Sequence, residues 1–207
     1  MFAMLWRIAP ARSRRTPPAG FILPAQPVLV DKPPSGPDWA HEVKHHGFRL
    51  LARKEGQRVT LWSRHGTKFT DRLPRIAEAV YDLPVEHVLI DGEAVVIRPD
   101  GHSDFEALGT KAGSATAAYV VFDLLQVNGK DIRQQRLKDR RAGLERIVKG
   151  ADAILFSESI AAEGALVFKK ACEMGLEGIV SKRVGSIYWS GRARNWTKTR
   201  NPAFQRR

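Results

Sequence analysis

A chain of 207 residues with 43% hydrophobic residues can bury the core of one domain but is too short for a multidomain enzyme. The single cysteine, Cys172, excludes an internal disulfide, which favours a reducing cytoplasm over a secreted scaffold. No stretch approaches the ~18 apolar residues of a membrane-spanning helix, so we expect no membrane partner.

The net charge of +12 is concentrated at the two ends of the chain. Residues 1–24 carry four arginines and no acid, and residues 178–207 carry eight lysines or arginines and no acid. Between them, residues 25–177 hold 22 basic and 22 acidic groups. Basic ends attract a polyanion, so nucleic acid or a nucleotide is the first partner to consider.

The composition divides the chain into a basic flexible tail over residues 1–24 and one folded domain over residues 25–207. Proline and glycine are dense between Pro17 and Pro37. We expect an extended lead-in there, because proline is excluded from central strands and from helix interiors.

Beyond the lead-in, short runs rich in Val, Ile and Leu alternate with turn residues. This pattern predicts strands over 39–43, 48–54, 58–63, 87–97, 118–125, 153–156 and 177–181. Helices are predicted over 74–83, 103–112, 137–149 and 163–174. Pro74 suits a first helical position, and Gly175 suits a left-handed cap. Ser103 and Glu106 have the spacing of a capping box. Because strands mostly follow strands, an antiparallel α+β domain is favoured over a doubly wound sheet.

A candidate nucleophile lies at the end of the first of these strands. The common phosphate-loop, dinucleotide, hydrolase and zinc motifs are missing from the sequence, so phosphate chemistry requires another arrangement. Lys44 is followed closely by Gly47 and Arg49. Amine attack on a phosphate requires an unprotonated lysine, which nearby cations and exclusion of water favour. Alone, the segment is weak evidence, because most lysines at strand ends are simply solvated.

Later segments supply the other groups of a nucleoside triphosphate site. Glu93 lies inside an apolar strand, where a carboxylate needs a cation, a metal or a hydroxyl partner. Phe122 places an aromatic ring beside an acid, and Glu177 places another acid where a strand begins. Lys198 and Arg200 alternate and therefore point to one face. Acids for Mg²⁺, a ring for a base and cations for phosphate together predict a nucleotide site.

In this order, the segments resemble the motifs of the covalent nucleotidyltransferases, and among them the ATP-dependent DNA ligases, in particular the ligase module of bacterial end-joining ligases. The matching residues are Lys44-x-x-Gly47-x-Arg49, Ser63-Arg64-x-Gly66, Asp91-Gly92-Glu93, Phe122-Asp123, Glu177-Gly178 and Lys198-x-Arg200. The resemblance implies an α+β covalent nucleotidyltransferase (ATP-grasp-like) fold. Two antiparallel sheets flanked by helices would hold the nucleotide between them.

The resemblance also implies a role for each residue around the nucleotide. Lys44 attacks the α-phosphate of ATP, displaces pyrophosphate and holds AMP through a phosphoramidate bond. Glu42 accepts a hydrogen bond from the adenine amino group, and Phe122 stacks on the adenine ring. Glu93 and Arg49 address the ribose.

The phosphates, the metal and the DNA follow from the same resemblance. Arg64, Lys198 and Arg200 neutralise phosphate charge as it develops. Glu177, together with Glu93, holds Mg²⁺. AMP then passes to the 5′-phosphate at a DNA nick or end, and the 3′-hydroxyl displaces it to seal the strand in DNA repair. The implied cofactors are ATP and Mg²⁺.

Three positions depart from the family pattern. His46 stands where the family has aspartate, and an imidazole supplies no fixed negative charge beside Lys44. We therefore expect lysine adenylation to survive while the step at the 3′-hydroxyl suffers. Arg200 replaces a lysine, which keeps the charge and changes the donor geometry. Trp189 stands where related ligases tend to have a basic residue, and it either stacks on a base or, as we favour, covers an edge of the core.

The chain ends at Arg207, directly after the last motif, whereas family ligases append an OB-fold domain. We therefore expect no C-terminal OB-fold domain, with a partner protein or the basic ends gripping DNA in its place. The expected location is the bacterial cytoplasm, with the nucleoid. Two alternatives remain open: a capping or RNA-ligase type of enzyme with the same fold, and a nucleic-acid-binding remnant that is non-catalytic or does not seal.

Overall fold

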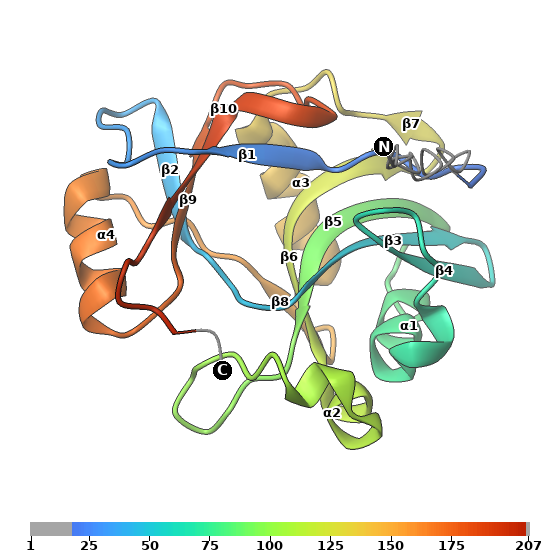
Figure 1. Ribbon diagram of the computed structural model, residues 1–207. Coiled ribbons are helices and arrows are strands. Elements are labelled where there is room, and N and C mark those ends of the chain that lie inside the picture. Colours follow the sequence, from blue (N-terminus) through green and yellow to red (C-terminus); the bar gives the residue numbers. More distant parts are fainter. Residues whose placement is uncertain (1–17, 206–207) are drawn as a thin grey trace, which may run out of the picture.

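The computed structural model describes residues 18–205, which form two β-sheets that face each other, with helices on their outer sides (Figure 1). Helices α1 Pro74–Tyr81 and α3 Leu137–Val148 pack against one sheet. Helix α4 Gly164–Glu173 packs against the other sheet. Within the described range, no helix has the length and apolar character needed to cross a bilayer.

The first sheet has four strands in the order β1-β10-β9-β2. Their bounds are β1 Ala25–Leu29, β2 Trp39–Val43, β9 Gly178–Arg183 and β10 Gly191–Arg200. β9 is antiparallel to both β2 and β10, whereas β1 lies parallel to β10. The predicted extended lead-in therefore contains a strand, and Pro27 is tolerated in it because β1 is an edge strand.

The second sheet has six strands, in the order β4-β3-β5-β6-β7 with β8 paired to β6. Their bounds are β3 Phe48–Glu55, β4 Arg58–Ser63, β5 His87–Val95, β6 Ala118–Val127, β7 Lys130–Asp131 and β8 Ile154–Phe156. β8 is parallel to β6, and the other pairs are antiparallel. The α+β class is confirmed, but each sheet contains one parallel pair and is mixed. Both parallel pairs join segments far apart in sequence, which apolar alternation does not reveal.

The main core lies between the six-stranded sheet and the two helices that cover it. Leu50 of β3, Ile76 of α1 and Leu144 of α3 are completely buried in one cluster. Burying a side chain of this size contributes about 1.5–3 kcal/mol. The core thus holds the six-stranded sheet rigid as a platform for the residues on its other face.

The helix predicted over residues 103–112 is wrong in its position. The Asp104 carboxylate accepts a backbone N–H at 3.0 Å, which makes a turn before the short 3-10 helix η2 Ala107–Gly109. Thr110 then caps α2 Lys111–Thr116, with its side-chain oxygen accepting a first-turn N–H at 3.0 Å. The effective cap lies seven residues after the position that the capping-box spacing indicated.

Other boundaries agree with the sequence. Helix α1 begins at Pro74 after the 3-10 helix η1 Thr70–Arg72, and Gly175 follows α4 with a φ of +69°. The predicted flexible tail falls mostly on residues outside the described range. Its described end lies against the six-stranded sheet, because Phe21 packs edge-on against Trp62 with ring centroids 6.0 Å apart.

Candidate active site

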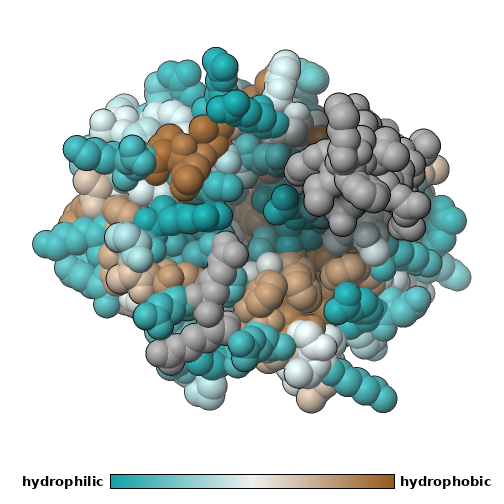
Figure 2. All heavy atoms as spheres, in the orientation of Figure 1, coloured by the Kyte–Doolittle hydropathy of each residue, from teal (hydrophilic) through white to brown (hydrophobic). Residues whose placement is uncertain are grey.

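A cleft between the two sheets brings together every residue predicted from the sequence to form the site. Its walls include Glu42, Lys44, Arg49, Arg64, Glu93, Phe122, Glu177, Lys198 and Arg200. Figure 2 shows the hollow on one face of the molecule, with hydrophilic residues above it and hydrophobic residues along its lower edge. Residues scattered through the sequence therefore meet at one site.

Lys44 lies where the chain leaves β2 and crosses from the four-stranded sheet to the six-stranded one. Its backbone N–H donates to the carbonyl of Gly178 at 2.9 Å, which fixes the start of this crossing beside Glu177. A side chain at Gly47 would collide with the carbonyl oxygen of Ala94 on β5. Glycine at position 47 therefore lets the crossing segment pass directly over β5.

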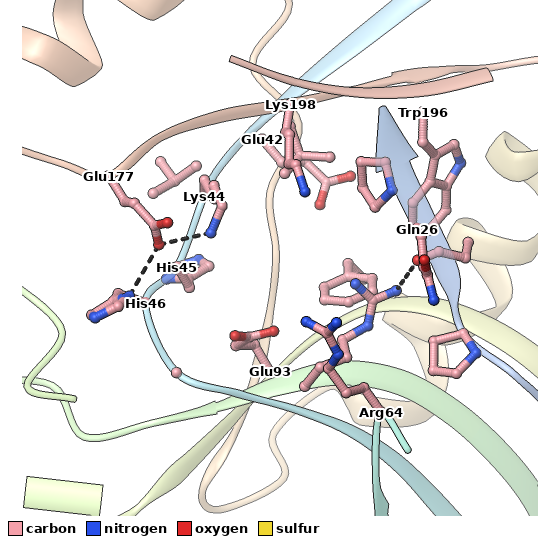
Figure 3. Close-up of a pocket in the computed structure, with 18 of the residues that line it drawn as sticks. Gln26, Glu42, Lys44, His45, His46, Arg64, Glu93, Glu177, Trp196 and Lys198 are labelled. Carbon is pink, nitrogen blue, oxygen red and sulfur yellow. Dashed lines mark hydrogen bonds and ion pairs between the residues drawn. The ribbon is translucent and has the colours of Figure 1, made fainter. Parts of the chain in front are cut away.

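The amine of Lys44 points into the cleft and is paired with one carboxylate (Figure 3). Its Nζ atom lies 2.7 Å from Oε2 of Glu177. The same oxygen accepts from Nδ1 of His46 at 3.2 Å. The Lys44 side chain is 20% exposed, so a substrate can reach it. Attack on a phosphate requires that the amine first lose the proton that it shares with Glu177.

Glu93 faces the same space from β5, opposite Arg49 in the strand register. Burial raises the pKa of Glu93 to about 7, and Glu177 adds to the effect while Arg49 and Lys44 oppose it. Among residues 18–205, no group of three or more His, Cys, Asp or Glu is placed to hold a metal. Mg²⁺ usually takes one or two carboxylates and completes its shell with water and substrate phosphates. Glu93 and Glu177 fit that requirement.

Arg49 is fixed by a buried acid. Its Nε and Nη2 atoms donate to the two oxygens of Asp91 at 2.6 and 2.8 Å. The Tyr188 hydroxyl donates to the same carboxylate at 2.6 Å. Burial works against the charge of the guanidinium, but Asp91 outweighs it and raises the pKa of Arg49 above its ordinary value. Arg49 is thus a permanent cation in the cleft wall.

The deep end of the cleft is built around Glu42, which is 2% exposed. Arg141 of α3 donates to its Oε1 at 2.9 Å, and the Ser157 hydroxyl donates to its Oε2 at 2.8 Å. Lys182 of β9 lies 2.9 Å from the same carboxylate. Burial lowers the pKa of Lys182 to about 8, although Glu42 opposes the shift. Glu42 is therefore held in one orientation by three donors.

Phe122 is packed between cations and a second ring. The Lys182 ammonium lies 4.2 Å from the centroid of its ring, and the Arg49 guanidinium lies 4.5 Å from it. Trp196 packs edge-on at 6.1 Å. Phe122 is only 9% exposed, so a base stacking on it would share the ring with these cations.

The mouth of the cleft carries a group of cations. Lys198 and Arg200 of β10 line this space together with Lys44 and Arg64. Burial, and then the charges of Arg200, Lys44 and Arg64, lower the pKa of Lys198. A bound polyphosphate would relieve this repulsion, so the charges favour a ligand with several negative oxygens.

Three residues of the deep end of the cleft were not identified from the sequence. Lys182 follows the matched Glu177-Gly178 pair, and strand alternation from Val180, which also lines the cleft, was the available signal. Arg141 and Ser157 reach Glu42 only through the packing of α3 and of the segment after β8, which no local pattern reveals.

The preferred interpretation of Trp189 is wrong. Its side chain is 59% exposed and does not cover the core. The neighbouring Tyr188 is 4% exposed and packs edge-on against Trp196 at 5.9 Å. Tyr188 therefore closes this edge of the core, and the indole of Trp189 lies on the surface.

The sequence matches the model of the ATP dependent DNA ligase domain over residues 30–200. This chain belongs to that family. The ligase domain is 38% identical over 189 residues to the multifunctional non-homologous end joining protein LigD of Pseudomonas aeruginosa, with 89% of this chain and 22% of that protein covered. It is 29% identical over 186 residues to the SPbeta prophage-derived DNA ligase-like protein LigB of Bacillus subtilis, with 87% and 68% covered.

A solved structure supports the fold as well as the family. Mycobacterial DNA ligase D complexed with ATP and MES aligns with a TM-score of 0.76 at 29% identity, over 86% of this chain and 60% of that one. The nucleotidyltransferase fold and the relation to end-joining ligases expected from the motifs are thereby confirmed. The chain spans about a fifth of the length of the Pseudomonas relative, of which 22% is covered.

Proposed function

We propose that this ligase domain transfers AMP from ATP to Lys44 as the first step of DNA joining. The Lys44 amine, whose side chain is 20% exposed, releases a proton to water and attacks the α-phosphorus of ATP. The N–P bond forms as the bond to the bridging oxygen breaks, and pyrophosphate leaves with the electron pair. The observation that carries the proposal is the Lys44 amine, which lies in the cleft 2.7 Å from a carboxylate among cations that suit a polyphosphate.

The two ends of the cleft set the orientation of ATP. At the deep end, the Glu42 carboxylate accepts from the adenine amino group and the Phe122 ring supports the base. Glu93 and Arg49 address the ribose between the ends. At the mouth, the cations of Arg64, Lys198 and Arg200 neutralise the phosphates.

Mg²⁺ is the cofactor that two acids of the cleft wall would hold. Glu177 and Glu93 supply its carboxylate ligands, and the bound ion would polarise the phosphate oxygens. Since Glu177 pairs with Lys44 in the structure, binding of a cation by Glu177 would also weaken the hold on the lysine proton.

Strand joining would follow by transfer of AMP to the 5′-phosphate at a DNA nick or end and attack by the 3′-hydroxyl. The LigD relative is described as a non-homologous end joining protein, and we extend that process to this chain. The basic segments 1–24 and 178–207, with a partner protein or domain in the role of an OB-fold clamp, would supply the grip on DNA. We place the protein in the bacterial cytoplasm, with the nucleoid.

Covalent labelling tests the first step. The protein is incubated with Mg²⁺ and ATP labelled at the α-phosphate, then denatured. We expect stable label on the native protein and on Lys130→Ala, a control at an exposed lysine of β7, and none on Lys44→Ala. Label on Lys44→Ala would contradict the proposal. Labelling with GTP in place of ATP distinguishes the ligase from a capping type of enzyme, which would accept GTP.

A second candidate is a domain that charges its lysine or binds nucleic acid but does not seal. The specific observation is His46 in place of an aspartate, with its imidazole directed away from the cleft centre (Figure 3). A nicked duplex added to the charged protein distinguishes the two. Sealed product supports the ligase, and adenylated or unchanged nick supports the second candidate.

A further inference from the structure

The His46 ring lies between two phenylalanine rings at one side of the cleft, whose wall includes both His46 and Phe105. Phe105 stacks against it with ring centroids 4.6 Å apart and planes inclined by 33°. Phe204 contacts it edge-on, with centroids 5.5 Å apart and planes inclined by 75°. Phe105 comes from the segment after β5 of the six-stranded sheet, and Phe204 follows β10 of the four-stranded sheet. The three rings therefore join the two sheets beside the cleft.

Within residues 18–205, the imidazole has a single hydrogen bond to fix it. Nδ1 donates to Oε2 of Glu177 at 3.2 Å, whereas Nε2 is buried and has no partner in this part of the chain. Only 12% of the His46 side chain is exposed, so bulk water does not fix its orientation. One hydrogen bond leaves the ring free to tilt about that contact, and the stacking partners remove this freedom.

The two phenylalanines are themselves anchored near Glu177. The backbone N–H of Asn201 donates to the Glu177 carbonyl at 3.0 Å, and the N–H of Phe204 donates to the Asn201 carbonyl at 3.2 Å. On the other side, Nε2 of His102 donates to the carbonyl of Met174 at 2.8 Å, which ties the Phe105 segment to the end of α4. The contacts on both sides of the His46 ring thus converge on the chain that carries Glu177.

We infer that Phe105 and Phe204 are positioning residues for the Glu177 carboxylate and act through the imidazole of His46. The inference rests on the proposed roles of Lys44 and Glu177. The stack holds Nδ1 against the oxygen that also meets the Lys44 amine, and so keeps Glu177 at the cleft. An aspartate at position 46 has no ring to stack and would face Glu177 with a like charge. The aromatic neighbours therefore match the histidine rather than the family aspartate.

The Mg²⁺ concentration that gives half-maximal labelling of the protein by ATP tests this role. We expect Phe105→Leu to raise it by about tenfold, the scale on which a residue supporting a metal ligand acts. Phe105→Tyr keeps the ring and should stay close to the native value. Phe69→Leu is the matched control, because Phe69 packs on Phe48, which in turn packs on Phe105, whereas the rings that pack on His46 are Phe105 and Phe204.

A double-substitution cycle decides between positioning and general packing. In a His46→Leu background, Phe105→Leu should cause no further increase in the Mg²⁺ requirement, because the ring through which it acts is gone. An equal effect of Phe105→Leu in both backgrounds, or an equal effect of Phe69→Leu, would overturn the inference.

A spectroscopic readout keeps this test separate from the proposed function. In protein with ¹⁵N-labelled histidine, we expect His46 to show a proton fixed on Nδ1, and Phe105→Leu to average the two ring nitrogens while Phe69→Leu does not. An unchanged His46 signal in Phe105→Leu contradicts the positioning role. If the native protein takes no label while the ring behaves as expected, the proposed function fails and the coupling of Phe105 to His46 stands.

Discussion

The two ends of the cleft are built in opposite ways. At the deep end, Glu42 is buried and held by Arg141, Ser157 and Lys182, each within 2.9 Å of it. At the mouth, Arg64 and Arg200 are exposed. A nucleobase presents one fixed hydrogen-bonding edge, which suits a rigidly held group such as Glu42. Phosphate groups arrive, leave and change partners during transfer, which suits cations that remain free to move. Under the proposed function, this difference would let one site select its nucleotide and still release pyrophosphate.

This contrast predicts that the largest effect comes from the deep end. Arg141→Met removes one of the two cations on buried Glu42 and leaves the Ser157 carbonyl without its donor. We expect the free energy of unfolding to fall by about 3 kcal/mol, as when a buried ion pair loses one partner. Urea denaturation measures the loss. Arg146→Met on the exposed side of the same helix is the control, and equal losses in the two variants would refute the distinction.

A smaller, pH-dependent effect is expected at Glu93, between the two ends. Its carboxyl has a pKa of about 7 in the folded protein and an ordinary value of 4.5 when unfolded. Between these values the folded state binds more protons, so the free energy of unfolding falls as pH rises through this window, by roughly 1–3 kcal/mol.

Denaturation at pH 5 and pH 8 measures this contribution. Glu93→Gln carries no titrating group, so it should gain stability relative to the native protein on going from pH 5 to pH 8. Glu145→Gln, at an exposed position of α3, should follow the native protein. Parallel pH profiles for the native protein and Glu93→Gln would show that burial does not raise this pKa.

The smallest effect is expected outside the cleft, where Tyr188 and Trp189 differ in burial. Tyr188→Phe removes the hydroxyl that donates to Asp91 and accepts from the backbone of Ala25, and should reduce the unfolding free energy by about 1–2 kcal/mol. Trp189→Ala should change it by less than about 0.5 kcal/mol. Thermal unfolding of the two variants measures the difference, and a larger loss for Trp189→Ala would mean that the indole packs on the core.

The sequence predicts the parts of this molecule whose information is local. The strands around Lys44, Glu93 and Glu177 follow from apolar runs, and the residue types they carry, in the order of the ligase motifs, predict one nucleotide site. Strand β1 and the parallel pairs depend on contacts between distant segments, so local patterns do not contain them. For the same reason Arg141 went unnoticed, because α3 carries several arginines and only its packing shows which one reaches Glu42.

Mass spectrometry of the charged protein tests the covalent role of Lys44 most directly. After incubation with ATP and Mg²⁺ and proteolysis under alkaline conditions, one adenylate should be found on the peptide that contains Lys44, and acid should remove it. Fragmentation that places the adenylate on Lys198 or Lys182, or a folded protein that binds ATP and gains no adenylate, would contradict that role.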